Sequence, residues 1–202
     1  PGEGDMGHVA RAAGVEPIVI PEMSREVSLR DALVIARLFC CLLRLKPHIV
    51  HTHKAKAGAV GRVAALLYRW LTPTALWLRP RTCLIVHTYH GHTFHSYHGA
   101  AWTRLFLAIE RVLARLGTDC LIAISPQQRR EIAEDYRIGR PQQFRVIPLG
   151  IDLDEAADCH GRFRAELGVA PEEVLIGIVG RLCDVKHQAM FLTAAERLLR
   201  DP

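Results

Sequence analysis

The sequence VLIGIVGRLCDVK, residues 174–186, has the pattern of a buried strand followed by a cationic loop. Its first six residues form a short, uncharged run with mostly β-branched side chains, which is typical of a strand buried on both faces of a parallel sheet. Gly180 ends the run, and ligands of such sheets bind at the carboxyl ends of the strands. Arg181 and Lys186 therefore follow at a predicted ligand-binding edge, just before a helix expected to begin near His187.

Two cations beside a helix amino terminus suit a diphosphate group. Arginine offers a planar fork of donors, lysine a point charge, and the helix its unpaired N–H groups. The alternative is a solvated loop with ordinary surface charges, and the pattern GR-x4-K alone does not separate the two.

Strands alternate with helices along the rest of the chain. Strands are predicted at residues 17–21, 48–51, 83–88, 120–124 and 144–148, and helices at residues 28–46 (capped by Ser28), 58–71, 101–116, after Ser125 and at 188–200. This spacing predicts an α/β fold with a parallel, doubly wound sheet. The loop after the second of these strands is expected to cover residues 52–58.

A polar, acidic segment after residue 150 breaks this rhythm. We therefore expect a first domain over residues 1–150, and a linker with the start of a second domain over residues 151–202. One strand and one helix cannot enclose a core, so the second domain is expected to be truncated. The first domain is also expected to lack its opening strand and glycine-rich turn.

The composition indicates anionic partners but does not identify which ones. The 202 residues are 50% hydrophobic and carry a net charge of +5, which predicts a globular protein with anionic partners. The six cysteines lie mostly in apolar runs without a CxxC pair, so buried thiols of a reducing compartment are expected. Residues 38–43 are far too short an apolar run to span a bilayer. These features predict a cytoplasmic location, with the inner membrane surface open as a docking place.

Histidines are concentrated before the third predicted helix. They are His87, His90, His92, His95 and His98, with His51 and His53 on a neighbouring loop. Zinc binding is one interpretation, but no acid or cysteine joins the cluster and the spacing matches no closed structural site. A polar loop on a cleft rim is the preferred interpretation for the last three, while His51 and His53 either contact a ligand or cap the sheet edge.

Three stretches together resemble a known family. They are PHIVHTH (residues 47–53) leading into Lys56-Ala57-Gly58 and Gly61-Arg62, HTYHG (residues 87–91), and GRL (residues 180–182) with Lys186. Glu110-Arg111 and residues 119–125 and 146–152 support the match. In this order they resemble the family-4 retaining glycosyltransferases of the GT-B fold, in the branch that builds capsule, exopolysaccharide or O-antigen chains.

The resemblance implies two Rossmann-like domains facing each other across a cleft. It implies that Arg181 and Lys186, with Gly180, grip the diphosphate of a nucleotide-sugar donor, for which UDP is the default by family frequency. Fixed cations stabilise the charge that develops there as the glycosidic bond breaks, so no metal cofactor is implied. It places His90 near the transferred sugar and the attacking hydroxyl. The acceptor-side candidates are His51, His53, Lys56, His87 and Gly91, although Lys56 also fits an ordinary solvated lysine.

The implied acceptor is lipid-linked or a polysaccharide, and nucleic acid is not among the expected partners. The family's carboxylate pair and nucleoside-binding loop would lie past Pro202, so this fragment alone is expected to be inactive. Two alternatives stay open: another GT-B enzyme such as a nucleotide-sugar epimerase, and a non-catalytic binding fragment. Contact with the inner membrane through residues 29–45, or through the loop around Trp70, Trp77, Arg79 and Arg81, is a further hypothesis.

Overall fold

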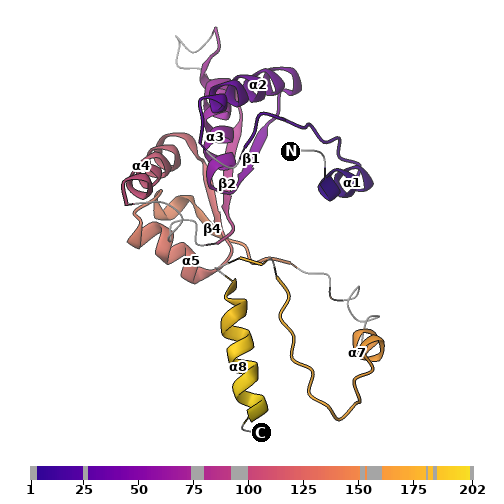
Figure 1. The fold of residues 1–202 in the computed structure, drawn as a ribbon. Coiled ribbons are helices and arrows are strands. Elements are labelled where there is room, and N and C mark those ends of the chain that lie inside the picture. Colours follow the sequence, from indigo (N-terminus) through magenta and orange to yellow (C-terminus); the bar gives the residue numbers. More distant parts are fainter. Residues whose placement is uncertain are drawn as a thin grey trace. The chain divides into compact units, whose positions relative to one another are not determined.

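The computed structural model describes residues 4–24, 27–73, 80–91, 100–150, 153, 161–180, 182–183 and 186–200. The chain divides into two compact units, Pro1–Leu149 and Gly150–Pro202, and each is described by itself. Figure 1 shows the elements of both.

The first unit contains a four-stranded parallel sheet in the order β1-β2-β3-β4. The strands are Ile49–His53, Leu84–Tyr89, Cys120–Ala123 and Phe144–Val146, joined by α3 (Ala55–Trp70), α4 (Ala100–Gly117) and α5 (Pro126–Arg130) with the π-helical turn η2 (Glu131–Asp135) and the 3-10 turn η3 (Pro141–Gln143). The predicted parallel α/β sheet is confirmed, as are the strands near residues 48–51, 83–88, 120–124 and 144–148. Ser125 caps α5, because its Oγ accepts from the Gln128 backbone N–H at 3.1 Å.

One face of this sheet carries the core. Ile85, Tyr89 and Leu121 are buried, whereas Ile49 and Leu84 on the opposite face are more than half exposed. Right-handed crossovers that proceed in one direction across a sheet place their helices on one face, which explains this alternation. The core cluster between sheet and helices consists of Tyr89, Ala114, Leu121, Ile132, Ile138 and Phe144.

Two helices precede the sheet. α1 (Gly4–Ala12) ends before Gly14, whose φ of +73° favours glycine. α2 (Arg30–Leu45) packs on α3 and confirms the helix predicted at residues 28–46. The predicted cap was wrong, because α2 begins one residue later than Ser28 requires. The Ser28 N–H instead donates to the Asp31 carboxylate at 3.0 Å.

Two local predictions in the first unit were also wrong. Residues 17–21 form no strand, because Pro17 and Pro21 lack the N–H groups needed for pairing. The predicted loop at residues 52–58 is much shorter, since β1 extends through His53 and α3 begins at Ala55. Lys54 alone joins strand and helix.

The second unit contains α7 (Arg162–Leu167) and α8 (Gln188–Arg200), and the helix predicted after His187 is confirmed. The buried strand predicted at residues 174–179 was wrong. Val179 is fully exposed, Ile176 is 60% exposed, and neither belongs to a strand. A strand requires a neighbour for its backbone hydrogen bonds, and the described residues of this unit provide no second strand.

The expectation of mostly buried thiols was also wrong for the cysteines that the structure describes. Cys83 is buried and Cys40 is exposed, while Cys41, Cys120 and Cys183 are intermediate; all five are free thiols. Cys40 lies in an apolar run on the outward side of α2, so local hydropathy did not predict its burial. Among the described residues, no helix is long and apolar enough to cross a membrane.

A buried ion pair connects the helices to the sheet. Arg62 of α3 and Glu110 of α4 are almost inaccessible to solvent, and Arg62 Nη2 lies 2.5 Å from Glu110 Oε1. The Tyr89 hydroxyl donates to Glu110 Oε2 at 3.0 Å, and Arg62 Nε donates to the Gly58 carbonyl at 3.0 Å. Burial, together with the Glu110 carboxylate, holds the pKa of Tyr89 well above its usual value. These contacts join α3, α4 and β2 in one network.

A neutral histidine is buried under the first turn of α3. The Thr52 hydroxyl donates to the Val86 carbonyl at 3.2 Å, so its oxygen is free to accept from His87 Nδ1–H at 2.9 Å. His87 Nε2 then carries the lone pair and has no hydrogen-bond partner in the described structure. Burial, with a contribution from the Arg62 charge, lowers the pKa of His87 to about 2. Gly58 makes room for this ring, because a Cβ there would lie 2.3 Å from His87 Cε1.

The ion pair predicts a large stability loss on removal of one charge. Glu110→Gln should lower the free energy of unfolding by about 3–5 kcal/mol, because it leaves the buried Arg62 charge uncompensated. Adding Arg62→Met should restore part of the loss, since no unpaired charge then remains. Tyr89→Phe is the control and should cost only about 1–2 kcal/mol for its hydrogen bond. Urea unfolding measures all three; equal stability of Glu110→Gln and wild type would contradict the prediction.

His87 predicts a loss of stability in acid. Its folded pKa is below the usual 6.5, so the unfolded chain takes up a proton that the folded chain excludes as the pH falls from about 6.5 towards 2. Its contribution to the free energy of unfolding should fall by about 1.4 kcal/mol per pH unit within that window.

Urea midpoints at pH 7, 6 and 5 test this prediction. His87→Gln should be less stable than the wild type at pH 7. Its free energy of unfolding should also fall less steeply with decreasing pH, because unfolding then takes up about one proton fewer. An unchanged slope in that variant would show that other groups cause the acid sensitivity.

Candidate functional site at the carboxyl ends of β1 and β2

The carboxyl ends of the first two strands bring three histidines together. His51 Nε2 lies 2.7 Å from Thr88 Oγ1, and His53 Nδ1 lies 2.8 Å from His90 Nε2. The ring centroids are 4.3 Å apart for His51 and His53, and 5.0 Å apart for His53 and His90. These distances define a histidine cluster of His51, His53 and His90, with Thr88 as its hydroxyl partner.

Strand geometry explains this cluster. His51 and His53 alternate with the core-facing Thr52, so both lie on the sheet face opposite the helices. The register pairs His53 with Thr88, which places His90 beside the end of β1. Sequence reasoning ended the strand at His51, put His53 on the following loop and missed Thr88. The signal that could have found Thr88 is its even spacing from His90 along a strand.

The surroundings of His51 and His53 favour their neutral forms. Partial burial, followed by repulsion from neighbouring imidazoles, lowers the pKa values of His51 and His53. The His53–His90 bond itself requires one protonated nitrogen and one lone pair, so two fully protonated rings could not form it. A neutral imidazole can donate a hydrogen bond to a hydroxyl group or accept one from it, and this is the chemistry that His51 and His53 offer.

Unusual backbone conformations follow both strands. Lys54, directly after β1, has φ 64° and ψ 167°, a region essentially restricted to glycine. Gly91, two residues after β2, has φ +149° and so requires glycine. The chain therefore turns sharply at the same edge of the sheet where the histidines lie.

Lys56 is used for packing. Its Nζ lies 2.8 Å from Asp31 Oδ1 and donates to the Ser24 carbonyl at 3.0 Å, which joins α3 to the start of α2. Burial alone would raise the pKa of Asp31. The hydrogen bond from Lys56 and the positive charge of Lys56 instead hold the pKa of Asp31 below its usual value. The structure thus places Lys56 in an ion pair near the edge, apart from the hydrogen bonds of the histidine cluster.

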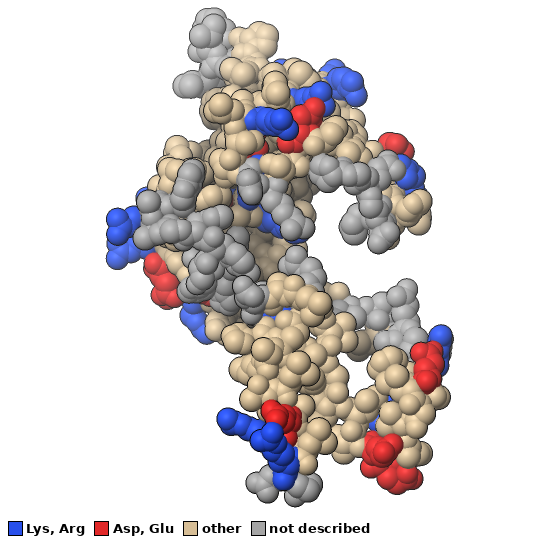
Figure 2. All heavy atoms as spheres, in the orientation of Figure 1, with Lys and Arg blue, Asp and Glu red and all other residues tan. Residues whose placement is uncertain are grey.

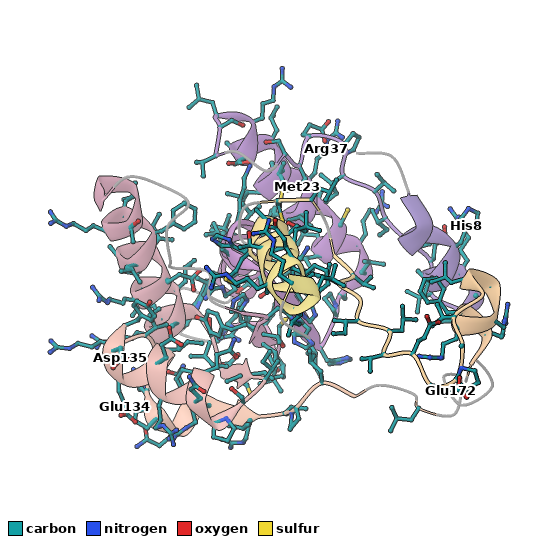
Figure 3. The ribbon with its side chains drawn as sticks, turned by 60° about the horizontal axis from the view of Figure 1, so that its bottom comes forward. His8, Met23, Arg37, Glu134, Asp135 and Glu172 are labelled. Carbon is teal, nitrogen blue, oxygen red and sulfur yellow. The ribbon has the colours of Figure 1, made fainter. Side chains whose placement is uncertain are left out.

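An open hollow of about 700 Å³ lies beside the start of α3. It is lined by Pro21, Glu22, Met23, Ser24, Arg30, Lys54, Lys56 and Ala57. Glu22 is also paired with Arg37 of α2 at 2.6 Å; Met23 and Arg37 are labelled in Figure 3. The hollow is more basic than acidic, but the described contacts do not tie it to the histidine cluster.

The predicted donor-side residues lie in the second unit. A Cβ on Gly180 would lie 3.7 Å from the Lys186 side chain, so the stem of Lys186 packs against Gly180. Lys186 precedes α8 by two residues. An open hollow of about 460 Å³ at the start of this helix is lined by Leu182, Cys183, His187, Gln188 and Ala189. Arg181 lies outside the described residues, as do His92, His95 and His98. The described part of the chain contains no group of three His, Cys, Asp or Glu side chains that could hold a metal ion.

Two curated proteins are similar to most of this chain. The chain is 27% identical over 191 residues to UDP-Gal:alpha-D-GlcNAc-diphosphoundecaprenol alpha-1,3-galactosyltransferase of Escherichia coli, covering 93% of this chain and 46% of that protein. It is 33% identical over 168 residues to D-inositol 3-phosphate glycosyltransferase of Nocardia farcinica, covering 76% of this chain and 32% of that protein. The chain thus spans about half or less of the curated relatives it matches.

Solved structures share the fold. HepE of Anabaena, in complex with UDP, matches with a TM-score of 0.66 at 18% identity over 96% of this chain and 48% of that one. A glycosyltransferase from Rickettsia africae matches with a TM-score of 0.56 at 12% identity, covering 84% of this chain and 40% of that one. The α/β fold with its parallel sheet thus matches GT-B glycosyltransferase structures. The model of Glycosyltransferase Family 4 matches residues 2–155, about three quarters of the sequence, and the chain therefore belongs to that family.

Proposed function

We propose that the protein transfers a sugar, with retention of configuration, from a nucleotide-diphosphate sugar to a lipid-linked or polysaccharide acceptor. The observation that carries the proposal is the hydrogen-bonded histidine cluster at the sheet edge of a family-4 chain. The name of the E. coli relative gives UDP-Gal as its donor and a diphosphoundecaprenol compound as its acceptor. The HepE structure was solved in complex with UDP. These names support a UDP-sugar donor and a lipid-linked acceptor.

His90 is assigned the central role on the first unit. Its Nε2 is engaged by His53, so Nδ1 is the nitrogen available to a hydroxyl of the transferred sugar or of the acceptor. His51, His53 and Gly91 shape the acceptor side around it. His87 acts from beneath, because its ring is fully buried, and Lys56 acts by holding α2 against α3.

Gly180, Arg181 and Lys186 are assigned to the donor diphosphate. Negative charge grows on the leaving diphosphate in the transition state, so positive side chains and helix N–H groups stabilise that state most. This role requires no metal ion. These residue assignments imply that the first unit forms the acceptor side and that the second unit begins the nucleotide-sugar side.

Transfer assays on the whole protein test this assignment. His90→Asn should reduce kcat about a hundredfold or more, with little change in donor affinity, because the positioned imidazole is lost. Lys186→Ala should weaken binding of the UDP-sugar and lower kcat as well.

His48→Asn is the matched control. This exposed histidine lies at the opposite, amino end of β1, so its replacement should leave turnover unchanged. Full turnover of His90→Asn would refute the role of His90. Release of UDP with a free or epimerised sugar, in place of a glycosylated acceptor, would refute the transferase assignment.

A further inference from the structure

α4 exposes an apolar stripe that the proposed reaction does not use. Leu105, Ile109, Val112 and Leu116 are 49%, 39%, 54% and 73% exposed. Their spacing of four, three and four residues places them on one side of the helix. These four residues, called here the α4 stripe, lie beside the buried positions Leu113 and Glu110 of the same helix.

A row of arginines follows the stripe. Arg104, Arg111 and Arg115 each precede a stripe residue by one position, which sets them along its flank. Glu110 is the only acid of α4, and it is buried against Arg62. Nitrogen-tipped side chains project from α4 in Figure 3, and Figure 2 shows basic side chains on the side of the molecule where Figure 1 places α4.

The neighbouring element does not reverse this charge. Arg111 Nε donates to the Tyr136 carbonyl at 2.8 Å, so η2 and its following turn lie beside the arginine row. Glu134 and Asp135, labelled in Figure 3, are exposed there. Residues 126–140 also contain Glu131, but the same segment contains Arg129, Arg130, Arg137 and Arg140. α4 and residues 126–140 together therefore carry more arginines than acidic residues.

Apolar side chains beside arginines fit an anionic lipid surface. The apolar side chains can enter the boundary between headgroups and acyl chains while the arginines contact phosphates. A second copy of the chain fits less well, because paired α4 helices would bring two arginine rows together without an exposed acid on either helix. We propose that α4 docks the protein peripherally on a bilayer containing anionic phospholipid.

This surface differs from the one suggested by sequence. α2, within the apolar residues 29–45, packs on α3 through its buried side. Its outward side alternates exposed leucines (Leu33, Leu45) with small or charged residues such as Ala36 and Arg37. The inference about α4 is also independent of catalysis, since it concerns lipid binding by the chain itself. Failure of the transfer assay would leave it standing.

Vesicle sedimentation of the 202-residue chain tests the proposal. The chain should bind phosphatidylcholine vesicles that contain phosphatidylglycerol and should bind pure phosphatidylcholine vesicles much less, with binding weakened by salt. Leu105→Gln with Val112→Gln and Leu116→Gln should lower the partition coefficient at least about tenfold. Arg104→Gln with Arg115→Gln should lower it about tenfold or more on anionic vesicles and weaken the salt dependence.

The matched control is Leu29→Gln with Leu33→Gln and Leu45→Gln, which removes three exposed leucines at and near α2. It should bind anionic vesicles like the wild type, and thermal melts should show that all variants fold. Equal binding of the wild type and the α4 stripe variant would overturn the proposal. Dimerisation in sedimentation velocity that the stripe variant abolishes would assign the stripe to a second copy and overturn it as well.

Discussion

The ion pair between Arg62 and Glu110 is the interaction on which the first unit depends. The two charges are shielded from water and must stay paired, so α3 and α4 have little freedom to shift relative to one another. Tyr89 extends the constraint into β2, one residue before His90. The position of His90, the proposed functional histidine, is therefore tied to a network buried beneath it. A polar network of this kind specifies one arrangement of the helices, where apolar packing alone tolerates several.

The two faces of β1 and β2 carry different kinds of side chain at the sheet edge. Residues that point towards the helices, such as Thr52 and His87, fix the strands through hydrogen bonds that water cannot reach. Residues that point the other way, such as His51 and His53, present imidazoles on the more open face. Because successive strand residues alternate between faces, two short histidine-containing strands supply both core residues and imidazoles on the open face.

Sequence reasoning succeeded where the pattern is local. Alternating runs and glycine or proline stops predicted the four strands of the sheet and most helices, because each depends mainly on its own residues. It failed at residues 174–179, where a strand depends on partners elsewhere, and at Ser28, where Asp31 supplied the helix-start hydrogen bond. The histidine cluster was predicted as a set of residues, but its pairing of His53 with His90 depends on the strand register. The Arg62–Glu110 contact spans 48 residues, and no short-range pattern predicts it.

The proposed chemistry also explains why the two units carry different charges at their candidate sites. An acceptor hydroxyl is neutral until late in the reaction, so neutral imidazoles can orient it without competing for the donor's diphosphate. Lowered pKa values favour the neutral forms of His51 and His53. The diphosphate gains charge as it leaves, so cations belong at its binding loop. In the proposed reaction the loop around Lys186 therefore carries the positive charge for the diphosphate, whereas the imidazoles of His51 and His53 need only hydrogen-bond a neutral hydroxyl.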